Sequence, residues 1–141
     1  FGDEKQKYIT IILDTEYPKI FGMDRVDPTR NIYVTEGPFD SLFLDNSIAV
    51  AQSDLRVPQF KDKAVLVPDN EPRNPEICKQ IERCIDEGYK VCLWPNTIKE
   101  KDINDMILSG MLPAEVLGII HSNSHSGLKA KTVFNSWKRT Y

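Results

Sequence analysis

The chain has 141 residues, enough for one domain with a hydrophobic core. Hydrophobic residues make up 40% and charged residues 28%, an ordinary balance for a globular protein. No apolar run approaches the ~20 residues of a membrane helix, so a membrane protein is not expected. The net charge is −3, but residues from 116 onward carry +4 and no acid, which leaves −7 for the rest. An acidic body with a basic tail excludes a uniformly basic nucleic-acid binder.

The start of the chain and its cysteines bear on its cellular context. The opening FGDEKQKYIT lacks the apolar segment of a secretion signal and has no initiator Met, so we expect a fragment of a longer protein. Cys78, Cys84 and Cys92 have neither disulfide-framework nor zinc-ligand spacing. We expect Cys84 and Cys92 to be core residues in a reducing, cytoplasmic compartment.

Short runs rich in β-branched residues predict strands buried on both faces, at 32–35, 47–51, 64–67 and 91–94. A further strand is predicted at 8–13, ahead of this series. Helix signals lie between and after the strands. Helices are expected to start at Pro38 and at Pro113. Three more are expected from Asn74-Pro75 to Gly88, from Asp102 to Gly110, and from Leu128 to near Trp137. The segment 121–127 is expected to be a polar break.

This alternation predicts an α/β fold with a mainly parallel central sheet of about four strands and helices on both faces. In such sheets, ligands bind beyond the carboxyl ends of the strands. That edge is therefore where a functional site is expected.

Acidic residues follow the predicted strands in three clusters. They are Glu36 and Asp40, Asp69 and Glu71, and Asp102 and Asp105. Carboxylates at buried strand ends cost free energy unless cations or hydrogen-bond donors compensate them, and a hard divalent ion such as Mg²⁺ suits oxygen ligands. The clusters together predict a metal site for phosphoryl or nucleotidyl chemistry.

Each cluster taken alone has an ordinary structural explanation. Asp40 could complement a helix dipole, and Asp69 could belong to an Asp-Asn turn between two prolines. Asp102 and Asp105 could form a helix cap. These alternatives stay open for the separate motifs.

In combination, EGPFDSLF (36–43), PDNEPRNP (68–75) and KDINDMI (101–107) resemble the toprim domain of DnaG-type replicative DNA primases. KYIT (7–10) and KIFGMDRV (19–26) resemble the segment that enters this domain, and the similarity is greatest to T-even-type bacteriophage primases. The resemblance extends from about Lys7 to Lys131. It implies the Rossmann-like toprim fold at 31–122, the end of a preceding subdomain at 1–30, and a basic C-terminal helix at 123–141.

The resemblance also implies roles for the acidic residues. Glu36, Asp69 and Glu71 would be catalytic, and all six clustered acids would surround Mg²⁺, which Mn²⁺ could replace. Glu71 stands where the family has a second Asp. Asn104 stands where many relatives have another acid, which Asp105 could replace. Arg73 and Lys101 would contact nucleotide or template phosphates.

The implied function is metal-dependent, DNA-templated synthesis of short RNA primers, weak or absent in an isolated fragment. The implied partners are single-stranded DNA, nucleoside triphosphates and a replicative helicase; zinc is expected only in an N-terminal domain outside this chain. Alternatives are a toprim nuclease or topoisomerase strand-cleavage domain, or a non-catalytic helicase-docking fragment. For docking or nucleic-acid binding the tail residues are Lys129, Lys131, Lys138 and Arg139. A helix that packs on its own domain is the simpler interpretation of this tail.

Overall fold

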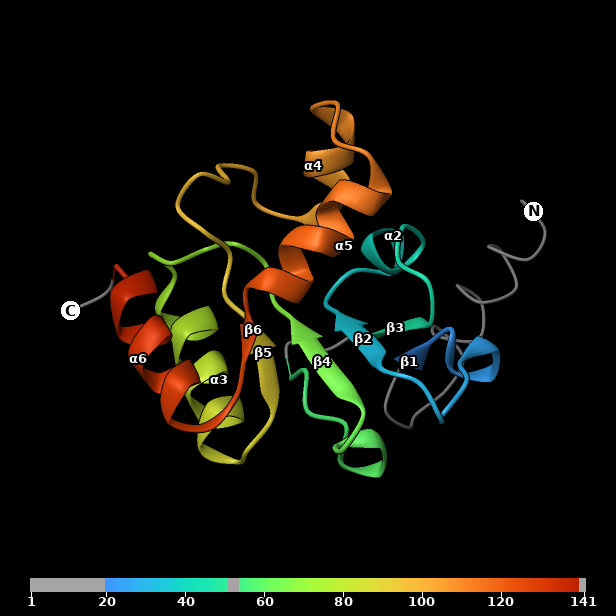
Figure 1. Ribbon diagram of the computed structural model, residues 1–141, viewed down its shortest axis with the longest axis horizontal. Helices are drawn as coiled ribbons and strands as arrows, with labels where there is room; N and C mark the ends of the chain where they lie inside the picture. The colour runs from blue at the N-terminus through green and yellow to red at the C-terminus, as the bar shows by residue number, and fades with distance from the viewer. Residues whose placement is uncertain (1–19, 51–53, 140–141) are drawn as a thin grey trace.

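The computed structural model describes residues 20–50 and 54–139. Within these ranges one six-stranded sheet has the order β1-β3-β2-β4-β5-β6 (Figure 1). The strands are β1 (Ile20–Phe21), β2 (Ile32–Thr35), β3 (Ser47–Val50), β4 (Ala64–Val67), β5 (Lys90–Cys92) and β6 (Ser124–His125). The inner strands β3, β2, β4 and β5 are parallel, whereas the edge strands β1 and β6 are antiparallel to their neighbours.

Helical segments lie between the strands and after the last one. They are the 3₁₀ helices η1 (Met23–Arg25) and η2 (Pro58–Phe60), and the α-helices α2 (Pro38–Ser41), α3 (Pro75–Asp86), α4 (Ile103–Leu108), α5 (Pro113–Ser122) and α6 (Gly127–Trp137). Asn74 caps α3 by accepting hydrogen bonds from the N–H groups of Glu76 and Ile77. Gly88 follows this helix with φ +90°, a conformation that favours glycine.

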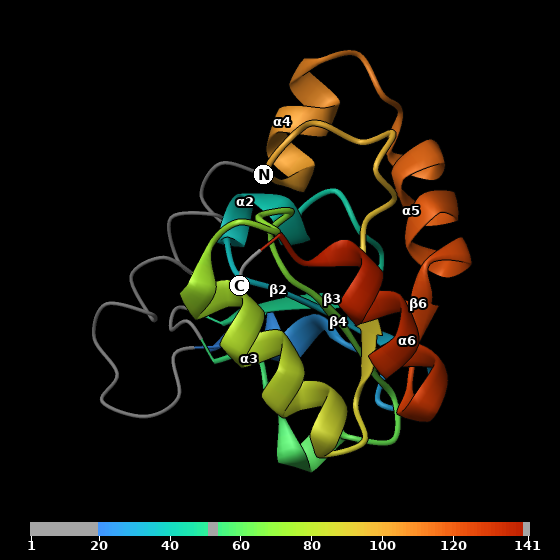
Figure 2. The same ribbon diagram turned by 90° about the vertical axis from the view of Figure 1, so that its left-hand side faces the viewer.

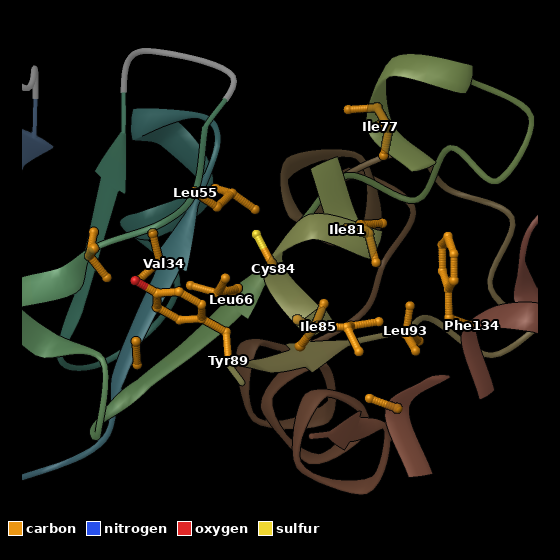
Figure 3. Packing of buried hydrophobic residues seen from close by; sticks show 14 of the residues in the cluster. Val34, Leu55, Leu66, Ile77, Ile81, Cys84, Ile85, Tyr89, Leu93 and Phe134 are labelled. Carbon is orange, nitrogen blue, oxygen red and sulfur yellow. The ribbon is translucent and has the colours of Figure 1, made fainter. Parts of the chain in front are cut away.

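Helices cover both faces of the sheet. On one face, alternate strand residues such as Val34 and Leu66 pack against α3 and α6, as Figure 3 shows. On the other face, Tyr33 and Val65 belong to a second buried cluster with residues of α4 and α5. The alternation follows from strand geometry, because successive side chains point to opposite faces.

The structure confirms the α/β class and the helices on both faces, but the sheet is larger and more mixed than predicted. Strands β2, β3 and β4 begin where the apolar runs predicted them. β5 begins one residue earlier than predicted, at Lys90, and ends at Cys92, so the buried Leu93 and Trp94 lie beyond it. Strands β1 and β6 were not predicted, since two residues are too few for a periodic signal. β6 lies inside the segment predicted as a polar break. The strand predicted at 8–13 lies outside the described residues.

The basic C-terminal segment packs on its own fold. Ala130, Phe134 and Trp137 of α6 are buried in the cluster shared with α3, and the two helices lie side by side (Figure 2). This agrees with the simpler of the two interpretations of the tail. The predicted division at residues 30 and 122 stays a prediction, although β1 pairs with β3 across the first boundary.

Two further expectations concern the cysteines and membranes. Cys84 and Cys92 are buried and free, as expected for core residues, and so is Cys78. No described helix combines the length and apolar character required to cross a bilayer.

Candidate metal site at the carboxyl edge of the sheet

The register of β2 and β4 brings two of the acidic clusters together. Thr35 lies opposite Val67, so the residues that follow each strand leave the sheet side by side. A Glu36 carboxylate oxygen accepts a hydrogen bond from the backbone N–H of Asp69 at 3.0 Å. Two residues separated by 33 positions in the sequence therefore form one corner of a site.

Asp40 reaches the same corner from α2. Its side chain is buried, and Oδ1 accepts a hydrogen bond from the N–H of Asn104 at 2.8 Å. Gly37 makes room for this carboxylate, because a Cβ at position 37 would lie 3.1 Å from Asp40 Oδ2. The turn at Gly37 thus allows a buried acid to reach the N-terminus of α4.

Asp102 is the N-cap of α4, as the sequence predicted, and accepts a hydrogen bond from the N–H of Asp105 at 2.8 Å. The first N–H groups of a helix have no partners within the helix, so they stabilise carboxylates placed beside them. Asp40 and Asp102 both bind this helix end. The capping interpretation of Asp102 is correct, and it also orients the carboxylate toward the site.

Carboxylate oxygens of Asp40, Asp69 and Asp102 lie within 4.8 Å of one another. We call these three residues together with Glu36 the acidic site. No other set of His, Cys, Asp or Glu side chains in the described ranges has comparable spacing.

Burial and mutual repulsion disfavour ionisation here. Burial, followed by the charges of Glu36 and Asp40, raises the pKa of Asp69 to about 8. Burial is also the main reason that the pKa of Asp40 rises to about 6. The pKa of Glu36 is raised mainly by burial, although the Asp69 N–H opposes the shift.

The donor set fits a divalent cation. All three ligand atoms are hard carboxylate oxygens, the type that Mg²⁺ and Mn²⁺ prefer. With Mg–O distances of about 2.1 Å, oxygens bound to one ion are about 3.0 to 4.2 Å apart. The three carboxylate oxygens, which lie within 4.8 Å of one another, are thus near this spacing. A bound cation would also remove the electrostatic penalty that raises the pKa values.

Asn70 connects the two loops that carry Asp69 and Asp102. Its side-chain amide donates to the carbonyl oxygens of Ile98 and Glu100 at 3.0 and 3.1 Å, and its backbone N–H donates to Lys101 O at 2.6 Å. These bonds fix the loop after β4 against the loop before α4. The sequence pattern does not predict this role, because the partners of Asn70 lie about 30 residues away in the chain.

Glu71 and Asp105 lie outside the group of three. The N–H of Glu71 bonds to Asp69 O at 3.0 Å, so the chain turns here, and Glu71 is not among the three acids whose oxygens converge. The Glu71 carboxylate pairs with Lys101 at 3.9 Å. Asp105 is exposed and acts on the site through its charge, which contributes to the raised pKa of Asp40.

The predicted cations have different surroundings. Arg73 is exposed in the loop after β4. Lys131 pairs with Asp86 at 3.6 Å, Lys138 lies over the Phe134 ring at 5.3 Å, and Lys129 is exposed on α6. The guanidinium of Arg139 donates to carbonyl oxygens at the end of α6.

Comparison with known proteins identifies a relative. The chain is 44% identical over 133 residues to the DNA primase of Enterobacteria phage T4. The match covers 92% of this chain and 39% of the length of that primase. No family model matches the chain.

Proposed function

We propose, from its relationship to the T4-type phage primases, that this chain is the toprim catalytic region of a DNA primase. The proposed reaction is metal-dependent, DNA-templated synthesis of short RNA primers. The four parallel inner strands and the Glu-Gly-x-x-Asp sequence after β2 support the toprim assignment. The carboxylates beyond β4 and at the start of α4 support it further.

The observation that carries this proposal is the convergence of Asp40, Asp69 and Asp102 within 4.8 Å. These residues would hold Mg²⁺ or Mn²⁺. The ion would neutralise developing charge on the transferred phosphoryl group and lower the pKa of the attacking hydroxyl. The protein contributes positioning and fixed charges.

In the proposed reaction a 3′-hydroxyl oxygen bonds to the α-phosphorus of a nucleoside triphosphate, and the bond to pyrophosphate breaks. Glu36 would accept the hydroxyl proton, since its raised pKa makes it a better base than an exposed glutamate. Lys101 neutralises Glu71 and lies close enough to Glu36 to lower its pKa. Arg73 and Lys101 supply positive charge for substrate phosphates.

The wider context follows the same proposal. Single-stranded DNA would be the template, nucleoside triphosphates the substrates and a replicative helicase the partner. A phage-encoded enzyme of this kind would act in the cytoplasm of the bacterial host. Because the chain corresponds to 39% of the T4 primase, residues outside it would complete template binding.

A metal titration tests the site. We expect millimolar Mn²⁺ or Mg²⁺ to raise the melting temperature of the wild-type chain, and Asp69→Asn to abolish the rise. Glu82→Gln is the control, because Glu82 is an exposed acid on α3. An equal rise in both variants, or none in the wild type, would contradict the metal site.

A second assay separates synthesis from cleavage. Labelled single-stranded DNA is incubated with Mn²⁺, with and without nucleotides, using this chain and a longer one that corresponds to the full relative. Primer products that require nucleotides support the proposal. Strand cleavage without nucleotides would instead establish the nuclease alternative.

A further inference from the structure

A cavity of about 900 Å³ lies beside the acidic site. Its walls come from the loop 70–74 after β4, the loop 93–99 after β5 and the C-terminal end of α6, which Figure 1 shows near one another. Asp40, Asp69 and Asp102 do not line it. The volume is in the range of small-molecule binding pockets. It is therefore separate from the acidic site, although the loop 70–74 that lines it follows directly after Asp69.

The charges of this cavity are opposite to those of the acidic site. Arg73, Lys99 and Arg139 line it, and its one lining acid, Glu71, pairs with Lys101. Neither Arg73 nor Lys99 forms an ion pair with any acid in the described ranges. We call this compartment the cationic cavity. Its unneutralised charge suits an anionic ligand.

Trp137 adds a buried hydrogen-bond donor. The residue is 9% exposed, and its indole N–H has no acceptor among the described residues. The other indole at the cavity, that of Trp94, donates to Pro68 O at 2.9 Å. Buried donors are rarely left without an acceptor. This nitrogen is closed to solvent, so a ligand oxygen or ring nitrogen would reach it only with a small movement of the cavity wall.

The walls are connected to one another and to the acidic site. The backbone N–H of Arg139 donates to Pro72 O at 2.7 Å, which joins the end of α6 to the loop 70–74. Asn70 in turn joins that loop to the loop before α4. A ligand in the cavity would thus lie next to the residues that position Asp69.

We propose that the cationic cavity binds a nucleotide, its phosphate held by Arg73, Lys99 and Arg139 and its base or sugar packed against the Trp137 side chain. The inference rests on the proposed function for the choice of nucleotide over other anions. It goes beyond that function by adding a binding site without carboxylate metal ligands. The nucleotide is either a free triphosphate or one unit of a single strand.

The test uses the indole N–H signals of Trp94 and Trp137 in ¹H–¹⁵N correlation spectra of the 141-residue chain. Trp137→Phe assigns the two signals. ATP, a short oligodeoxythymidylate and inorganic triphosphate are titrated separately in EDTA, so that metal binding plays no part. We expect a saturable shift of the Trp137 signal with ATP or the oligonucleotide. Whichever binds more tightly identifies the source of the nucleotide.

Two charge reversals complete the test. Arg73→Glu is expected to weaken nucleotide binding roughly tenfold or more, the loss of a charge-assisted contact. Lys79→Glu, at an exposed lysine on α3 outside the cavity, is expected to change it less than twofold. Asp69→Asn is expected to retain binding in EDTA, which separates this inference from the metal site.

Three results would overturn the inference. One is the absence of a Trp137 shift with both nucleotide probes. Another is equal weakening by Arg73→Glu and Lys79→Glu, which would indicate general charge attraction. The third is inorganic triphosphate binding as tightly as both nucleotide probes, which would indicate an anion site without nucleotide recognition.

Discussion

At the acidic site a backbone N–H holds each of three carboxylates, whereas in the cationic cavity Arg73 and Lys99 reach solvent without an ion-pair partner in the described ranges. The acids of Glu36, Asp40 and Asp102 are fixed before any ligand arrives. Fixed geometry suits a small ion with strict coordination, and adaptable cations suit a larger, flexible anion. The comparison predicts that a single substitution at the acidic site strongly lowers metal affinity and activity, whereas a single substitution in the cavity lowers ligand affinity only in part.

The largest expected effect is that of Asp69→Asn on primer synthesis. Removing one central carboxylate should lower synthesis by roughly 10²-fold or more, since charge stabilisation at the reacting phosphate is lost. Circular dichroism should show an intact fold. Activity within tenfold of wild type, in a chain long enough to prime, would remove Asp69 from the mechanism and weaken the contrast between the two regions.

Asn70→Ala tests whether the acidic site depends on its supporting bonds. The variant loses the side-chain bonds to Ile98 and Glu100, so metal affinity is expected to fall roughly 10- to 100-fold. Calorimetric titration with Mn²⁺ measures the change. Asn135→Ala, at an exposed position on α6, is the matched control. Unchanged affinity in Asn70→Ala would show that the two loops keep their positions without this residue.

The pH dependence of the free energy of unfolding tests the acidic site, because carboxylates at this site have raised pKa values. Asp40 and Asp69 have pKa values of about 6 and about 8 in the folded chain, above the ordinary value of about 3.9 for Asp. Their contribution to stability is complete below pH about 4 and is lost as the pH rises through these values. Denaturant unfolding in EDTA should show this loss between pH 4 and 8.

Asp69→Asn should flatten that profile, and saturating Mn²⁺ should reverse the trend. Glu82→Gln should leave it unchanged, since Glu82 is exposed on α3. A wild-type profile in EDTA that rises from pH 4 to 8 would contradict the buried, mutually repelling carboxylates.

The smallest expected effect is that of Gly37→Ala. The added Cβ would lie 3.1 Å from Asp40 Oδ2, so the carboxylate must shift by a few tenths of an ångström. Backbone strain is not expected, because Gly37 has φ −117°. We expect a few-fold loss of Mn²⁺ affinity, less than for Asn70→Ala. A loss as large as that of Asp69→Asn would show that Asp40 tolerates no displacement.

Much of the local structure was predictable from the sequence. The apolar runs located β2, β3 and β4, and Asn74, Asp102 and Pro113 marked helix starts where the structure has them. These signals are local, since they depend on side-chain periodicity and on hydrogen bonds within a few residues. The sequence did not predict the edge strands β1 and β6, because they are strands through their pairing with β3 and β5 and not through their composition.

The sequence by itself determined that acids follow the buried strands and cap α4, because each position depends on neighbouring residues alone. Only the tertiary structure decided that Asp40, Asp69 and Asp102 converge while Glu71 pairs with Lys101. It alone placed Trp137 and Arg139 beside the loop after β4. Strand order, register and helix packing set these distances, and a linear pattern of residues does not specify them.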